Sequence, residues 1–505
     1  MINLNSKKLG IVLSYLTQAI SIFSGIIYTP LMLRLLGQSE YGLYQLVNSV
    51  VSYLGLISFG FSSSYLRYYS KFKIANDNEN VARLNGMFLV IFSVMAAICL
   101  ICGSIMVFNI REILGTGLTE AELGKARILF VLLLISLAIT FPKSVFGSII
   151  LSQEKFVFLK ITDLLYSVFN PFLSLPLLLL GFGSVGMVFV SFFLTLVTFC
   201  LFVYYSLRKL NSHFLFNNFD FSLFKDLWQF TFFIFLNQVI DQINWNIDKL
   251  LLGRFINTAA VAIYGVGFSL QSMYTQFANS VSSVFVPKVN ILANDLNKKN
   301  ELNKIFVQIG RMQFAILSLA LTGLIVFGKP FIYFWAGPEY TDSFFVALIL
   351  IIPITFPLIQ NIGIEIQRAM NKHQARSIVY FFIALGNLLI SIPLIKFLGP
   401  IGAALGTGIA LVLGNILFMN WYYYKKIGLD IFMFWKNIFS MTPPVICSLA
   451  LGLISSVIFD LYRFNNLIIL IIIYSCVFIL LMYKYGFNNE EKQYILIPLK
   501  KMFNK

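Results

Sequence analysis

The stretch that decides the fold is residues 237–265, NQVIDQINWNIDKLLLGRFINTAAVAIYG. It is apolar enough to cross a membrane, yet it contains two aspartates. Its polar residues recur at steps of four, three and four, which on an α-helix place them on one face: Asn237, Asp241, Asn244 and Asp248. A carboxylate at membrane depth is costly unless it meets water, a cation or a proton, so this stripe is a candidate functional site. The alternative is a set of buried polar groups that only join helices.

The composition predicts an all-α polytopic membrane protein. Of the 505 residues, 59% are hydrophobic and only 11% are charged, which is outside the range of soluble globular domains. Apolar runs of about 20 residues, the length that crosses a hydrocarbon core, recur along the chain, and the first is long enough to be a retained span. The fourteen predicted transmembrane helices are 10–36, 40–66, 84–109, 127–152, 157–180, 184–207, 227–254, 258–287, 304–328, 343–370, 376–397, 400–424, 437–459 and 465–484.

The distribution of lysine and arginine predicts the orientation. If the N-terminus is cytoplasmic, the inner segments contain 27 of the 37 lysines and arginines. Because basic residues concentrate in cytoplasmic loops, both termini are predicted to be cytoplasmic. The net charge of +16 then reflects topology, and no nucleic-acid partner is needed to explain it.

An internal repeat organises the spans. Four groups recur in one order at offsets of 215 to 217 residues: Thr140-Phe141-Pro142 with Thr355-Phe356-Pro357, Asn170 with Asn387, Pro176 with Pro393, and Gly186 with Gly402. An even number of helices per copy gives both copies the same orientation, a parallel repeat found in transporters. The repeat predicts two six-helix lobes, residues 1–210 and 211–430, followed by two extra helices and a cytoplasmic tail in 431–505.

Polar faces on four helices are candidates to line one central cavity. The offset of 216 places Asn237 over Ser21, on a face of the first span that Gln18 continues. With about seven extra residues in the second copy's loop, Asn48 lies over Gln271 in the eighth span. Only the second copy is acidic. The predicted polar lining consists of Gln18, Ser21, Asn48, Asn237, Asn244, Gln271 and Thr275.

Basic residues at depth are candidates to bind an anionic substrate. Lys143 lies near the middle of the fourth span, where an ammonium group is expected to face a cavity. Arg368, Lys249 and Arg254 are further candidates, although Lys249 and Arg254 are close enough to an outer end to reach the membrane surface instead. Glu365 and Arg368 lie three residues apart, so a local ion pair is the structural alternative to a coupling role for Glu365.

Several motifs are excluded as sites. Residues 181–186 fit G-x-G-x-x-G, but they join two membrane spans without a preceding strand, so they form a turn. Cys99 and Cys102 lack a second ligand pair and are expected to pack, and no metal site is predicted. The chain contains no P-loop, and no cofactor is predicted.

At this point the chain resembles the oligosaccharide flippases of the multidrug/oligosaccharidyl-lipid/polysaccharide exporter superfamily. The resemblance rests on the fourteen spans, on the segment LMLRLLGQSEYGLYQL at 31–46, and on the form D-K-L-L-L-G…Y-G that opens the second copy. It implies a non-enzymatic, multi-pass protein of the bacterial cytoplasmic membrane. Such a protein moves an undecaprenyl-diphosphate-linked repeat unit, for O-antigen, capsule or a related polymer, to the outer leaflet by alternating access.

The resemblance also implies a cationic cavity for the diphosphate, with membrane lipid, a polymerase and chain-length machinery as partners. Asp241 and Asp248 are then either salt-bridge partners of the cavity cations or carriers of a coupling proton or Na⁺, and we favour the coupling role for Asp241. The first alternative function is a drug/cation antiporter of the same superfamily, which Lys143 disfavours. The second is a membrane-embedded polysaccharide polymerase or ligase, which the short outer loops disfavour.

Overall fold

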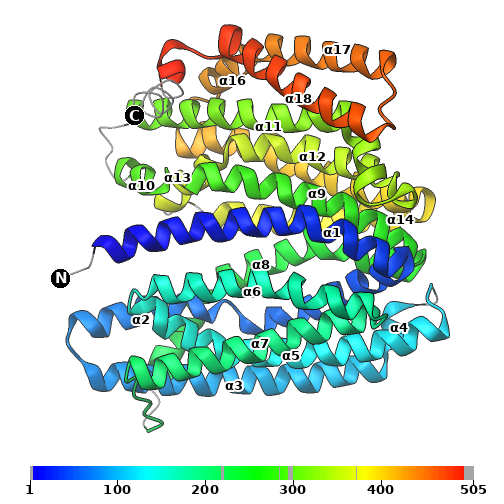
Figure 1. Cartoon of the computed structure of the whole chain (residues 1–505). Helices are drawn as coiled ribbons and strands as arrows, with labels where there is room; N and C mark the ends of the chain where they lie inside the picture. The colour runs from blue at the N-terminus through cyan, green and yellow to red at the C-terminus, as the bar shows by residue number, and fades with distance from the viewer. Residues whose placement is uncertain are drawn as a thin grey trace. The chain divides into compact units, whose positions relative to one another are not determined.

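The computed structural model describes residues 4–115, 117–217, 221–283, 285–293, 299–370, 372 and 374–493. These residues fold into helices joined by short connections, and they contain no strand. The α-helices, labelled in Figure 1, are α1 Leu4–Leu54, α2 Phe61–Ile74, α3 Asn78–Phe108, α4 Ile110–Leu114, α5 Glu120–Ser152, α6 Phe156–Leu179, α7 Gly183–Tyr204, α8 Phe221–Phe255, α9 Thr258–Ser283, α10 Val286–Ala293, α11 Lys299–Trp335, α12 Ser343–Ile359, α13 Asn361–Ala369, α14 Gln374–Leu411, α15 Met419–Tyr422, α16 Ile431–Phe439, α17 Thr442–Ile458 and α18 Phe464–Leu481.

Two long helices, α1 and α14, each contain one predicted span and the first part of the next. With 51 residues, α1 would extend far beyond the roughly 30 Å of a hydrocarbon core if it were straight. It changes direction at Gly37, whose φ of 74° is a left-handed conformation that glycine adopts without strain. The same device divides α14 at Gly399, where φ is 56°. The predicted span pairs 10–36 with 40–66 and 376–397 with 400–424 therefore meet at glycine corners.

Length and hydropathy alone identify fewer spans than the sequence predicts. Among the described residues, nine helices are long and apolar enough to cross a membrane, or ten when α12 and α13, bent by 46°, count as one. Helices α8 and α9 are not among them. They include the predicted polar stripes, and residues such as Asp241 and Gln271 reduce their apolar character.

Contacts divide the chain into two compact units. Unit 1 contains residues 1–262 and 395–400, and unit 2 contains 263–394 and 401–505. The division falls inside α9, so α8 belongs with the helices that precede it. The lobe boundaries near residues 210 and 430 remain a prediction.

In unit 1, neighbouring helices pack side by side and side chains cap the first turns of α3 and α5. In Figure 1, α3, α5 and α7 lie side by side, and contacts join α3 to α5 and α5 to α7. Helix α5 begins with a capping box, in which Thr119 Oγ1 accepts from the Glu122 N–H at 3.3 Å and Glu122 accepts from the Thr119 N–H at 2.8 Å. Asp77 accepts from the Asn80 N–H at 3.0 Å to cap α3, and this hydrogen bond lowers the pKa of the Asp77 carboxyl.

The repeated positions form the same interhelical hydrogen bond in each unit. In unit 1, Asn170 Nδ2 donates to Ser191 Oγ at 2.9 Å, between α6 and α7. In unit 2, Asn387 Nδ2 donates to Thr407 Oγ1 at 3.3 Å, between the two halves of α14. Ser191 and Thr407 are themselves 216 residues apart, so the bond links two pairs of repeated positions. The matching hydrogen bonds support the internal repeat, and they could not be seen from the sequence alone.

In unit 2 the two extra helices pack against α11. The buried side chains of Phe327 on α11 and Leu467, Leu470 and Tyr474 on α18 form one apolar cluster. Helices α11 and α17 are also in contact. The extra helices are therefore an integral part of this unit.

Candidate functional site

The candidate site in unit 1 is a polar cavity around Lys143. The cavity has a volume of about 410 Å³ and lies among α5, α6 and α7. The Lys143 Nζ donates to Thr198 Oγ1 at 2.6 Å and lies 5.2 Å from the centre of the Phe202 ring. Both contacts stabilise an ammonium group that a membrane helix would otherwise expose to hydrocarbon. The lining residues are Thr140, Lys143, Thr162, Asp163, Tyr166, Ser167, Thr195, Thr198 and Phe202.

Local sequence explains how α5 presents this lysine. Pro142 has no N–H, so it interrupts the helical hydrogen-bond pattern immediately before Lys143. Nearby hydroxyls bond back to the helix: Thr140 Oγ1 donates to the Ser136 carbonyl at 3.0 Å, and Ser144 Oγ to the Thr140 carbonyl at 2.8 Å. The segment around Lys143 thus keeps its own hydroxyls satisfied inside a membrane helix.

The cavity contains charges of both signs. Asp163 on α6 lies in its wall and forms an ion pair with Lys160 at 3.2 Å. The Asp163 side chain is 53% exposed, so this pair contributes little to stability. Lys143 and Asp163 are the charged residues of the wall, Lys160 lies next to it through its pair with Asp163, and the surrounding hydroxyls can donate to or accept from a ligand.

Sequence reasoning missed part of this lining. It did not identify Tyr166 on α6 or Thr195 and Thr198 on α7. A signal was available, because Ser191, Thr195 and Thr198 follow one another at steps of four and three in an otherwise apolar helix. The same periodicity that singled out the stripe at 237–248 would have selected this face.

The predicted stripe on α8 is divided between two environments. Asp241 is exposed and Asn237 and Asn244 are half-buried, whereas Asp248 is fully buried. The neighbouring Lys249 is only 5% exposed. The predicted roles of these residues in coupling and lining stay predictions.

Lys249 lies in a polar interface between α1 and α8 within unit 1. Its Nζ donates to Gln45 Oε1 at 3.2 Å, and Gln45 Nε2 donates to the Tyr41 hydroxyl at 2.7 Å. Two turns away along α8, Gln242 Oε1 accepts from Ser52 Oγ at 3.1 Å. Lys249 is therefore a buried, hydrogen-bonded group, which corrects the alternative that it reaches the membrane surface.

The other unit 1 candidates do not line the Lys143 cavity. Arg254 is exposed at the end of α8 and donates from Nη1 to the Glu112 carbonyl at 3.2 Å. On α1, Gln18 and Asn48 are half-buried and Ser21 is exposed. Of the predicted cations, Lys143 alone lies in the wall of this cavity.

In unit 2 the candidates form local pairs. Gln271 Nε2 donates to Thr275 Oγ1 at 2.9 Å, and Thr275 Oγ1 donates back to the Gln271 carbonyl at 3.0 Å. Arg368 Nη1 donates to Glu365 Oε1 at 2.7 Å, with 63% of the Arg368 side chain exposed. The ion pair that the sequence offered as the structural alternative is therefore present.

Sequence reasoning also missed a buried ion pair between α11 and the segment after α18. Arg311 donates from Nε to Glu491 Oε1 at 2.6 Å and from Nη2 to Oε2 at 2.9 Å, and both side chains are 5% exposed or less. Arg311 also donates to the Asn437 carbonyl at 2.8 Å and to the Gly486 carbonyl at 2.8 Å. The sequence analysis assigns no site role to Arg311 or to the tail.

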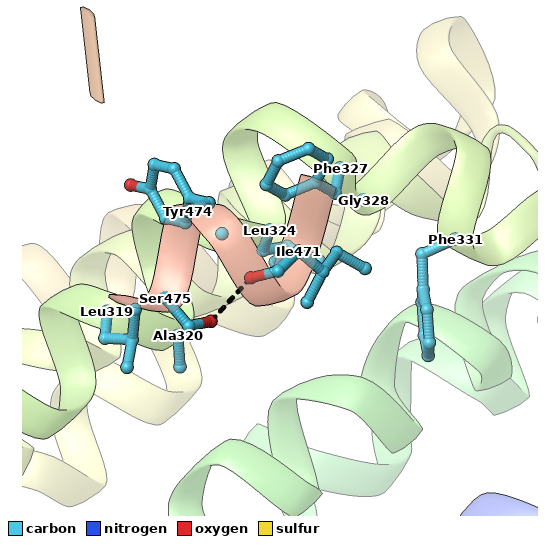
Figure 2. Close-up of a pocket in the computed structure, with 10 residues that line it drawn as sticks. Leu319, Ala320, Leu324, Phe327, Gly328, Phe331, Ile471, Tyr474 and Ser475 are labelled. Carbon is cyan, nitrogen blue, oxygen red and sulfur yellow. Dashed lines mark hydrogen bonds between the residues drawn. The ribbon is translucent and has the colours of Figure 1, made fainter. Parts of the chain in front are cut away.

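An apolar pocket lies between α11 and α18. Figure 2 shows Phe327, Leu324 and Leu319 of α11 beside Ile471 and Tyr474 of α18, around a volume of about 270 Å³. The only hydrogen bond drawn there is internal to α18, from Ser475 Oγ to the Ile471 carbonyl at 2.7 Å. Because both helices are apolar enough to cross a membrane, this pocket is suited to a hydrocarbon chain.

Comparison with known families identifies the chain. Residues 9–289, more than half of the sequence, match the model of a family described as "Polysaccharide biosynthesis protein". The chain belongs to the polysaccharide biosynthesis protein family. This membership confirms the resemblance that the sequence motifs indicated.

Within the described residues, no group of three or more His, Cys, Asp or Glu side chains could hold a metal ion.

Two curated relatives cover most of this family member. "Uncharacterized membrane protein EpsK" of Bacillus subtilis (strain 168) is 22% identical over 440 residues, which is 83% of each chain. "Putative O-antigen transporter" of Shigella flexneri is 21% identical over 402 residues, covering 77% of this chain and 91% of the relative.

Solved structures show the fold of this family member. "Lipid II flippase MurJ, inward closed conformation" aligns with a TM-score of 0.72 at 17% identity, covering 94% of this chain and 99% of the other. A multidrug resistance MATE family transporter of the MOP superfamily aligns with a TM-score of 0.57 at 16% identity, covering 81% and 96%. The chain is therefore an all-α polytopic membrane protein with about fourteen helices, and the predicted fold class is confirmed.

Proposed function

We propose that the protein is a flippase for an undecaprenyl-diphosphate-linked oligosaccharide. It moves the repeat unit from the inner to the outer leaflet of the bacterial cytoplasmic membrane, with both termini in the cytoplasm, for assembly of a cell-surface polysaccharide. The observation that carries the proposal is Lys143, a lysine held at membrane depth in a cavity lined by hydroxyl groups. Membership of the polysaccharide biosynthesis family and the likeness to a relative named as an O-antigen transporter support it.

The chemistry of the cavity fits such a substrate. A diphosphate cannot enter hydrocarbon without a cation, and an ammonium group that donates charge-assisted hydrogen bonds supplies one. Hydroxyls on Thr195, Thr198 and Tyr166 can exchange hydrogen bonds with sugar hydroxyls. Alternating access of the two predicted lobes then carries the polar head across while the tail stays in lipid.

The direct test is transport by the purified full-length protein in liposomes. A polyprenyl-diphosphate oligosaccharide with a fluorescent sugar is added to the inner leaflet, and its arrival outside is followed by quenching with a membrane-impermeant reagent. We expect protein-dependent flipping of this lipid and none of a fluorescent organic cation. Flipping of the cation alone would replace the proposal with the drug/cation antiporter, the second function that shares this fold.

We propose that transport is coupled to a proton or Na⁺ gradient and that Asp241 binds the coupling ion, with Asp248 and Glu365 as weaker candidates. Asp241 is the exposed carboxylate of the α8 stripe, so it can exchange a proton or Na⁺ with water, whereas Asp248 is fully buried and Glu365 already pairs with Arg368. Asp241→Asn keeps the shape and removes the titratable charge. We expect flipping that no longer responds to an imposed pH or Na⁺ gradient. An Asp241→Asn protein with unchanged gradient dependence would remove Asp241 from the coupling role.

A further inference from the structure

A second polar cavity in unit 1, here called the loop pocket, is separate from the Lys143 cavity. It has a volume of about 540 Å³, within the range of small-molecule sites, and shares no lining residue with the first cavity. Its wall is built from α2, the start of α3, the connection between α5 and α6, and residues 210–213. In Figure 1 these segments lie at one end of unit 1, the end at which the predicted cytoplasmic connections occur.

The loop pocket presents cations without internal partners. Lys73 on α2 and Lys155 at the start of α6 both lie in its wall, with His213 beside them. Within the described residues neither lysine forms an ion pair or a hydrogen bond through its side chain. Glu154 is the one carboxylate in the wall, so the two lysines leave a positive excess even when His213 is neutral.

The pocket also presents unsatisfied and prearranged polar groups. Ser212 Oγ is buried and has no hydrogen-bond partner among the described residues, which costs free energy unless a ligand or water supplies one. Glu154 and Asn211 adopt left-handed backbone conformations, with φ of 59° and 47°, that are strained for residues other than glycine. Strain of this kind is typical of binding sites.

The segment that closes the pocket is fixed rather than loosely attached. Asn85 Nδ2 donates to the His213 carbonyl at 2.9 Å, and the Leu215 N–H donates to the Ala82 carbonyl at 3.0 Å. Gly86 allows this approach, because a Cβ there would collide with the Leu215 carbonyl. The loop that contains the unsatisfied Ser212 hydroxyl is therefore held in place before a ligand arrives, and Lys73 and Lys155 reach the pocket as exposed side chains.

We propose that the loop pocket binds the phosphate and hydroxyl groups of an anionic lipid headgroup, such as phosphatidylglycerol, from the inner leaflet. Two ammonium groups match a phosphodiester, and amide and hydroxyl side chains such as Asn78 and Ser152 match a polyol. The position at the ends of membrane helices, on the predicted cytoplasmic side, is where anionic lipids and basic residues meet. This site is independent of the transported substrate.

The test measures binding to the purified full-length protein in neutral detergent by calorimetry. The probes are dihexanoyl-phosphatidylglycerol, dihexanoyl-phosphatidylcholine and glycerol 3-phosphate. We expect the wild type to bind the first probe preferentially, and Lys73→Gln with Lys155→Gln to weaken that binding at least tenfold. Lys71→Gln is the matched control, because Lys71 is exposed on the same helix but outside the pocket, and it should bind like the wild type.

Three results would overturn the proposal. Equal binding of the two lipids would remove headgroup recognition, and equal affinity in the double variant and the Lys71→Gln control would remove the pocket. Glycerol 3-phosphate binding as tightly as the lipid would assign the site to a soluble phosphate ester instead. Lys143→Ala should leave this binding unchanged, so failure of the proposed function and failure of this site are distinguishable.

Discussion

Glu491→Gln is expected to destabilise unit 2 by about 3–5 kcal/mol, the usual cost of leaving one member of a buried ion pair without its partner. The substitution barely changes shape, but it leaves the Arg311 guanidinium buried against a neutral amide. Glu491 also accepts from the Asn488 N–H at 2.9 Å, a hydrogen bond that the glutamine oxygen can still accept, so the expected loss comes from the ion pair. The measurement is the half-life of the detergent-solubilised protein on heating, because large membrane proteins unfold irreversibly.

Two further variants make this prediction specific. Glu490→Gln removes a neighbouring exposed carboxylate and should change the half-life little. Arg311→Met combined with Glu491→Met removes both charges and should be less damaging than Glu491→Gln, because no unpaired charge remains. A Glu491→Gln protein as long-lived as the Glu490→Gln protein would show that the ion pair does not hold the end of the chain to α11.

Lys143→Met is expected to reduce flipping of the lipid-linked oligosaccharide by roughly 10- to 100-fold, since a hydrogen bond to a charged group contributes about 1.5–3 kcal/mol. Methionine keeps the length and helix preference of the side chain while removing the ammonium group. Lys143→Arg keeps the positive charge and should retain a larger part of the activity, although the guanidinium does not fit the contact to Thr198 in the same way. Liposome flipping at equal protein content is the readout.

The control for this prediction is Lys329→Met, which removes an exposed lysine from α11 in unit 2. It should reach the membrane and flip lipid like the wild type. If Lys143→Met also flipped like the wild type, the cavity among α5, α6 and α7 would not be part of the transport path.

The fold was largely predictable because it depends on patterns that span many residues. Most membrane helices follow from apolar length, and a repeat of about 216 residues can be read directly from the sequence. The breaks near Gly37 and Gly399 were also predicted, since the spans before them end at 36 and 397, but the left-handed φ of each glycine required the structure. The boundaries of units 1 and 2 could not be predicted from the sequence, because hydropathy does not show which helices pack against one another.

The site was only partly predictable, because a position on a helix face does not specify what that face touches. Lys143 could be selected from its depth alone, but its contacts with Thr198 and Phe202 required the packing of α5 on α7. Arg311 shows the opposite case, in which a residue near a membrane boundary resembled a surface charge and is instead buried. Charges at span ends are ambiguous for this reason.

The same hydrogen bond occurs twice, from Asn170 to Ser191 and from Asn387 to Thr407, and this recurrence indicates that the chain arose by duplication. Duplication of a six-helix ancestor would leave such a bond in both descendants, with serine and threonine as interchangeable hydroxyl donors and acceptors. Each copy keeps this interhelical hydrogen bond because it joins the copy's own pair of helices, whereas the sequence at other positions can change. The acidic residues on α8, absent from the matching face of α1, are then a later specialisation of one copy on a scaffold inherited twice.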